Sequence, residues 1–213
     1  MNQPVASKKR LTLSELRTNE HTIMAALAVA VGLAGGFGAV GFRYLINFFQ
    51  TLAYGSSDEL LHVVLALPWY LKVWVPAAGG LVVGPLVYFF AREAKGHGVP
   101  EVMEAVALKG GVIRKRVVVV KSLASAISIS TGGSVGREGP IVQIGSALGS
   151  TLGQMLKVSQ DRMRTLVGCG AAAGIAAPFN APIAGSMVAL EVMLGEFGLA
   201  PFSPSVLSSV VAT

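Results

Sequence analysis

Three short stretches of the sequence place glycine and proline around polar residues and then continue into apolar sequence. They are residues 96–100 (GHGVP), 136–140 (GREGP) and 180–182 (NAP). Proline is favoured in the first turn of a helix, where its missing N–H is not needed. Glycine lets the preceding backbone turn and approach a ligand closely. Each stretch therefore predicts the start of a helix.

The start of a helix is a weak anion-binding group. Its first N–H groups have no helical partner, and the aligned peptide dipoles add a partial charge of about +0.5. Several such starts that meet at one point would bind an anion without a fixed full positive charge. An anion held in this way can leave again quickly, which transport requires.

The second stretch also carries two adjacent charges, Arg137 and Glu138. Neighbouring residues on a helix do not face one another, so an ion pair between these two is not expected. The pattern instead predicts an interruption of regular structure, at which the two charges face a ligand or another part of the protein. The alternative is that Glu138 is a carboxylate that only caps its helix.

Patterns typical of soluble enzymes are incomplete in this chain. GHGVPE lacks the third glycine of a dinucleotide-binding fingerprint, and GGSVGREG lacks the Gly-Lys-Ser/Thr ending of a P-loop. The histidines, His21, His62 and His97, do not have metal-ligand spacing. No serine lies in a nucleophile elbow. We therefore expect no enzyme, no metal site and no cofactor.

The composition indicates a membrane protein. Of the 213 residues, 53% are hydrophobic and 13% are charged, against about 25% charged residues in soluble domains. The 26 glycines suit close helix packing in a bilayer. Basic clusters at 8–10 and 114–116 flank apolar sequence, as cytoplasmic loops do, and no aromatic residues are interleaved with them for nucleic-acid binding.

The apolar segments predict an all-α, multi-pass integral membrane protein. Residues 22–42 and 73–91 are uncharged and long enough to span, the second with an irregular or kinked course at its prolines. The later apolar segments are 122–135, 140–156, 165–190 and 205–213. They are short or broken by glycine and proline, which points to a binding site at bilayer depth. Pro178 and Pro182 should divide 165–190 into two helices.

Two domains of unequal size follow from this pattern. Residues 1–21 are expected to form a cytosolic tail, with a short surface helix around 11–17, and residues 22–213 the membrane domain, cut within a helix. Spaced glycine pairs, such as Gly145 with Gly149 and Gly170 with Gly174, predict contacts between helices of the same chain.

The motifs GHGVPE, GREGPIVQIG and GAAAGIAAPFNAPIAG, in this order, closely resemble the CLC family of chloride channels and proton-coupled chloride transporters. The resemblance covers nearly the whole chain from Thr22. It implies a CLC-type bundle of tilted, partly re-entrant helices, of which this chain is the first of two inverted repeats. It also implies a homodimer in a plasma or inner membrane, with the N-terminus cytosolic, a second half of the fold, and chloride as the transported ion. The segment from Pro182 onward resembles the family's dimer interface.

The resemblance gives Glu138 the role of a gate, whose carboxylate occupies an anion site and swings away when protonated or displaced. Chloride occupancy and protonation are then thermodynamically linked. The residues that it implies around the anion are His97, Gly98, Val99, Arg137, Gly139, Pro140 and Ile141, with backbone N–H groups as the main donors and none from the proline. Lys121 matches a lysine of many relatives, which either raises the potential of the pore or snorkels to the interface.

Two positions depart from the family pattern. His97 replaces a serine that binds the anion in many relatives; its imidazole could donate, or it could turn away. Val192 replaces the glutamate that follows Glu191 in proton-coupled members, and valine cannot relay a proton. This favours a voltage- or pH-gated chloride channel. The alternatives are a proton–chloride exchanger and a non-conducting half-subunit that needs a separately made second half.

Overall fold

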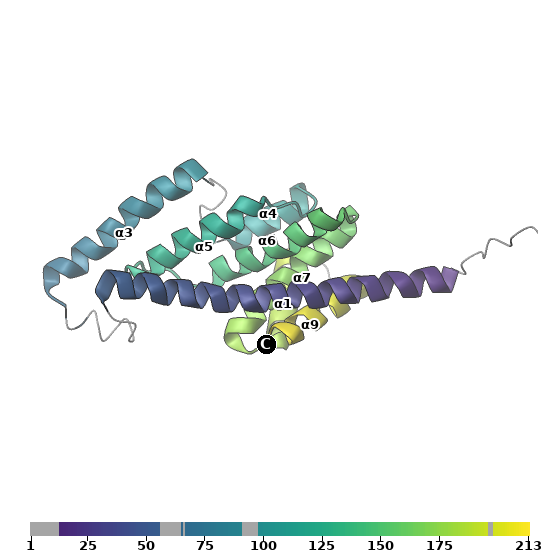
Figure 1. Cartoon of the computed structure of the whole chain (residues 1–213). Coiled ribbons are helices and arrows are strands. Elements are labelled where there is room, and N and C mark those ends of the chain that lie inside the picture. Colours follow the sequence, from purple (N-terminus) through teal and green to yellow (C-terminus); the bar gives the residue numbers. More distant parts are fainter. Residues whose placement is uncertain (1–12, 56–64, 66, 91–97, 196–197) are drawn as a thin grey trace, which may run out of the picture.

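The computed structural model describes residues 13–55, 65, 67–90, 98–195 and 198–213. The expectations for residues 1–12 and for His97 lie outside the described residues. Within these ranges the chain is helical and contains no strand. The elements are α1 (Leu13–Tyr54), α3 (Trp69–Phe90), α4 (Val99–Leu108), α5 (Lys115–Ser130), α6 (Glu138–Leu156), α7 (Gln160–Phe179), α8 (Pro182–Val188), the π-helical segment η2 (Ala189–Leu194) and α9 (Leu199–Ala212) (Figure 1).

Two of these helices are long and apolar enough to cross a membrane. They are His21–Tyr54 within α1, with 34 residues, and α3, with 22 residues. In Figure 1, α1 runs along the whole bundle, whereas α3 lies at its edge beside α5. Large apolar side chains on both helices are exposed, among them Phe37, Trp74 and Leu81. Such surfaces fit a bilayer, because lipid tails are as apolar as these side chains.

Two details of the expected helices are wrong. Residues 13–17, the described part of the short helix expected around 11–17, form the first turns of α1 and not a separate helix. No glycine or proline between them and the membrane span interrupts the helix. The second span is not irregular, since α3 stays helical through Pro76 and Pro85, while the alternative of a kink at these prolines stays a prediction. Prolines are tolerated in spanning helices, where local adjustments satisfy the freed backbone groups.

The expected division of residues 165–190 into two helices is confirmed at Pro182, whereas Pro178 does not interrupt the chain but lies inside α7. Helix α7 ends at Phe179, and Asn180 follows in the left-handed conformation with φ 50°. Asparagine tolerates this conformation, and Pro182 then opens α8. The last helix begins at Leu199, earlier than expected, because Pro201 lies in its first turn, where proline is accepted.

The core is built on the pair α6 and α7, which cross with their backbones in close contact. A Cβ added at Gly145 would collide with the carbonyl oxygen of Gly170, and one added at Gly170 would collide with that of Gly145. Further along α6, a Cβ at Gly149 would collide with the carbonyl oxygen of Leu166. The glycine pairs predicted from the sequence are thus contacts within this chain, which confirms that expectation.

The remaining helices surround α7. Helix α9 packs on α7 and α1, and the Ser208 hydroxyl donates to the Cys169 carbonyl at 3.0 Å. Cys169 is fully buried, as expected for a small apolar residue. Helices α4 and α5 both pack on α6, and α3 packs on α5, where Gly79 lies against the side chain of Thr131. These contacts fix the position of the start of α6.

Substitution Gly170→Ala should destabilise the protein, because the added methyl group meets the Gly145 carbonyl oxygen with no room to move. Overpacking of this kind costs about 1–3 kcal/mol. The control is Gly84→Ala on α3, where a Cβ has no neighbour within 4 Å and the change should stabilise by at most about 1 kcal/mol. Thermal unfolding of the detergent-solubilised variants would measure both effects. Equal midpoints for the two variants would contradict the packing described here.

Candidate functional site

Two of the three predicted helix starts meet in the structure. Gly98 precedes α4 with φ 96° and ψ −36°, a conformation that L side chains rarely adopt. A Cβ at Gly98 would lie 2.6 Å from the carbonyl oxygen of Gly139 in the first turn of α6. Both the conformation and the close approach require glycine. Gly98 and Gly139 thereby bring the starts of α4 and α6 into direct contact.

The start of α4 is capped from within the same helix. The Gly98 N–H donates to Oε2 of Glu101 at 2.9 Å, and the Val102 N–H donates to the Gly98 carbonyl at 3.2 Å. The Gly98 N–H, expected to face an anion, is therefore directed at a carboxylate of its own helix. Val99 supplies the first N–H of α4, and Pro100 has none.

The start of α6 leaves two N–H groups ahead of its first helical hydrogen bond. That bond runs from the Ile141 N–H to the Arg137 carbonyl at 3.2 Å. Because Pro140 has no N–H, the donors that precede this bond belong to Glu138 and Gly139. The sequence expectation included Ile141 as a donor to the anion, and the helix uses this group internally.

A cavity of about 420 Å³ opens at the meeting point of α4 and α6. It is walled by α3, α4, α5, the loop before α6 and the first turn of α6. The residues that line it are Val83, Val87, Val99, Lys121, Ala124, Ser125, Ser128, Ser134, Val135, Gly136, Glu138, Gly139 and Pro140. We call it the gate cavity. It combines two helix starts, three serine hydroxyls, one cation and one carboxylate.

The two ionisable side chains of the gate cavity differ in exposure. Lys121 is 3% exposed, so it does not snorkel to an aqueous interface within this chain. Glu138 is exposed, and its Oε2 lies so close to Gly136 that a Cβ there would collide with it. The carboxylate is thus folded back over its own loop, and the missing side chain at Gly136 makes room for it.

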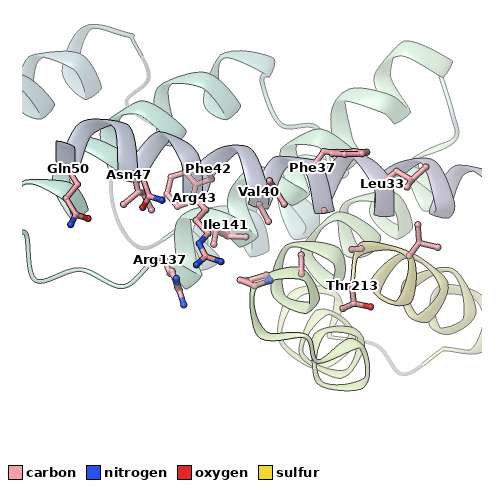
Figure 2. A pocket seen from close by; sticks show the side chains of 17 residues that line it. Leu33, Phe37, Val40, Phe42, Arg43, Asn47, Gln50, Arg137, Ile141 and Thr213 are labelled. Carbon is pink, nitrogen blue, oxygen red and sulfur yellow. The ribbon is translucent and has the colours of Figure 1, made fainter. Parts of the chain in front are cut away.

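Arg137 belongs to a different cavity from Glu138. This second space, of about 730 Å³, lies between α1, the start of α6 and the ends of α7 and α9. Figure 2 shows Arg43 and Arg137 reaching into one end of it, with Asn47 nearby on α1. Ile141 also lines this space. The adjacent charges of GREGP are therefore separated, one on each side of the start of α6.

The predicted site residues thus divide into groups. Val99, Gly139 and Pro140 line the gate cavity together with Glu138. Gly98 does not line this cavity but lies against Gly139, where α4 meets α6. Arg137 and Ile141 line the second cavity, beside α1.

The other predicted features lie elsewhere. The third helix start, at Asn180 and Pro182, lines neither cavity. Val192 is 40% exposed on η2, which packs on α4 but is not part of the gate cavity. In the part of the chain that the structure describes, no three His, Cys, Asp or Glu side chains are grouped as metal ligands would be.

Two features of the site were missed in the sequence. Glu101 was not singled out, although it follows Gly98 by three residues, the spacing of a capping box. The serines of the gate cavity come from α5 and the following loop. Isolated serines in apolar sequence give no signal of their own, because their common face appears only once α5 has packed on α6.

Comparison with known proteins shows the family to which this chain belongs. Residues 79–213 match the profile described as voltage gated chloride channel. The chain is 38% identical over 193 residues to a putative chloride channel protein ClcB-like of Ralstonia nicotianae, covering 89% of this chain and 45% of that protein. It is 32% identical over 189 residues to the voltage-gated ClC-type chloride channel ClcB of Escherichia coli, covering 87% and 45%.

Solved structures with the same fold agree. A slow cyanobacterial Cl⁻/H⁺ antiporter superposes with a TM-score of 0.70 at 27% identity, covering 89% of this chain and 46% of its own. A CLC-type fluoride/proton antiporter gives 0.74 at 25%, covering 94% and 46%. The chain spans about half the length of the relatives it matches. It therefore belongs to the voltage gated chloride channel (CLC) family, with the all-α membrane fold of that family.

Proposed function

We propose that this chain forms one half of a chloride pathway, in which the anion binds in the gate cavity and Glu138 acts as the gate. The observation that carries the proposal is that Val99, Glu138 and Gly139 line one cavity at the meeting point of two helix starts. The N–H groups and dipoles of α4 and α6 favour negative charge there. The second half of the fold would complete the site.

The proposed gating rests on competition between two anions. The Glu138 carboxylate is tethered to the first residue of α6, where the same N–H groups and dipole that would hold chloride also favour the carboxylate. Protonation removes the tethered charge and leaves the site to the mobile anion. Chloride binding and proton binding then favour each other, and each strengthens the other by the same factor.

A chloride channel, gated by voltage or pH, is our first assignment, and proton–chloride exchange is the alternative. Val192 favours a channel, because valine has no proton to relay. Both curated relatives are named as chloride channels. The two solved relatives at 25–27% identity are antiporters, which favours exchange. A non-conducting half-subunit that pairs with a separate second half is a further alternative, since the chain spans about half of its relatives.

The proposed setting is a homodimer in the plasma or inner membrane, with the N-terminus cytosolic and the bilayer, the chloride ion and the second half of the fold as partners. The proposed partners include no nucleic acid and no cofactor. Exposed apolar side chains on α8 support a dimer contact there, since Ile183 is 78% exposed and Met187 and Val188 are also uncovered. The basic residues of Arg114–Arg116 support a cytoplasmic side under the positive-inside rule.

The deciding experiment uses the protein that carries this chain together with the second half of the fold, reconstituted in liposomes. Chloride efflux and proton movement are recorded together, with potassium and valinomycin setting the voltage. Chloride flux without uphill proton movement is the expected result for a channel. Protons driven uphill at a fixed ratio to chloride would instead assign an exchanger, with a proton route that bypasses Val192. If neither ion moves, the chloride pathway itself is wrong.

Substitution Glu138→Gln in the same protein should remove the pH dependence of chloride flux and any proton coupling. The amide has nearly the shape of the carboxylate but carries no charge and does not titrate between about pH 4.5 and pH 7.5. Flux should therefore be nearly constant over this range, whereas the unmodified protein conducts more at the acidic end. The control is Glu104→Gln on α4, whose carboxylate pairs with Lys109 at 2.8 Å on the exposed surface. Unchanged pH dependence in Glu138→Gln would exclude this residue as the gate.

Substitution Gly98→Ala should reduce chloride flux by at least about tenfold. The methyl group would meet the Gly139 carbonyl oxygen and force the two helix starts apart. The positive φ adds strain of the order of 1–3 kcal/mol. Gly55→Ala is the matched control, because Gly55 also has a positive φ, 73°, but no neighbour within 4 Å. Equal flux in the two variants would show that the contact of α4 with α6 does not shape the anion path.

A further inference from the structure

Lys121 places a buried cation in the wall of the gate cavity. Its side chain is 3% exposed, and it shares this wall with Val99, Gly139 and Glu138. A buried charge is stable only when it is paired or well hydrogen-bonded. A full positive charge also acts on an anion more strongly than the partial charge of about +0.5 at a helix start. The balance of charge around Lys121 therefore determines how tightly an anion is held.

Glu101 provides the opposing charge. Glu101 follows Val99 by two residues on α4, and Val99 lines the gate cavity together with Lys121, so the carboxylate is placed where its charge favours the ammonium form of Lys121. The same carboxylate accepts the Gly98 N–H at 2.9 Å, and Gly98 lies directly against Gly139. Glu101 thus connects the cation of α5 to the turn that begins α4. Two further charges, Glu104 on α4 and Lys109 directly after its end, pair with each other at 2.8 Å.

We infer that Glu101 is a positioning and charge-balancing residue of the anion path. It holds the Gly98 turn so that α4 meets α6, and it offsets Lys121 so that the gate cavity attracts chloride without trapping it. The inference rests on the proposed function, because it assumes that chloride binds in this cavity. Conduction needs binding that is strong enough for entry and weak enough for exit. A balanced pair beside two helix starts meets both requirements.

A double-mutant cycle tests the inference in the complete, detergent-solubilised protein, with chloride itself as the titrated ligand in calorimetry. Glu101→Gln keeps an oxygen that can accept the Gly98 N–H but removes the charge, so chloride binding should tighten by about tenfold and flux should slow. Lys121→Met keeps a long side chain but leaves Glu101 unbalanced, so binding should weaken by about tenfold. The double variant should return to within about threefold of the unmodified protein.

The opposite signs of the two single variants distinguish charge balance from a merely structural role. If both weaken binding and the double variant does not recover it, the inference is overturned while the chloride site stands. If the unmodified protein binds no chloride, the proposed function fails and the inference falls with it. The control pair, Glu104→Gln and Lys109→Gln, should leave the affinity unchanged; opposite shifts there would mean that any charge on α4 acts in this way.

The test can still be decided if the Lys121→Met variant does not fold. If Lys121→Met alone is unstable, the Glu101→Gln protein is compared with the double variant, in which no buried charge is left unpaired. Removal of the cation in that background should weaken chloride binding by about tenfold. An unchanged affinity in this comparison would show that Lys121 does not act on the anion, and would overturn the inference.

Discussion

The satisfaction of backbone polar groups away from water is the constraint on which this structure depends. Inside a bilayer, irregular backbone is tolerated only where it is buried in protein or lines an aqueous cavity. The starts of α4 and α6 break regular structure, so each needs a partner for its N–H groups. At α4 the Glu101 carboxylate takes the Gly98 N–H. At α6 the first N–H groups open onto the gate cavity. The Gly98 N–H is therefore capped by the protein itself, whereas the first N–H groups of α6 have no cap from their own helix and face the cavity that we propose for the anion.

The start of α6 also separates charge. Glu138 lies on the side of α3 and α5, and Arg137 lies on the side of α1, although the two residues are neighbours in the chain. A direct ion pair between them would hold the carboxylate in place and cancel the field at the cavity. Their separation is what the proposed gating requires, because the carboxylate is not held by its neighbour, while the helix dipole and Lys121 both contribute positive potential near the start of α6.

The sequence predicted those features that depend on local chemistry. The two spans, the division at Pro182 and the helix starts at Pro100 and Pro140 follow from periodicity, composition and the properties of proline. Features that depend on packing were not predictable. Nothing in GREGP indicates that Arg137 and Ile141 face α1, because that follows from the angle at which α6 lies on α7. The burial of Lys121 was left open, since snorkelling and burial depend on which helices cover α5.

The glycine contact between α6 and α7 has a consequence for how such a sequence can drift. Every other amino acid carries a Cβ, so a glycine that touches a facing carbonyl has no conservative replacement. Gly145 and Gly170 stand in this position toward each other. Gradual exchange through similar residues, which most apolar positions permit, is closed to this pair. A descendant that lost either glycine would have to move a whole helix, and with it the first turn of α6 and the cavity that the turn helps to form.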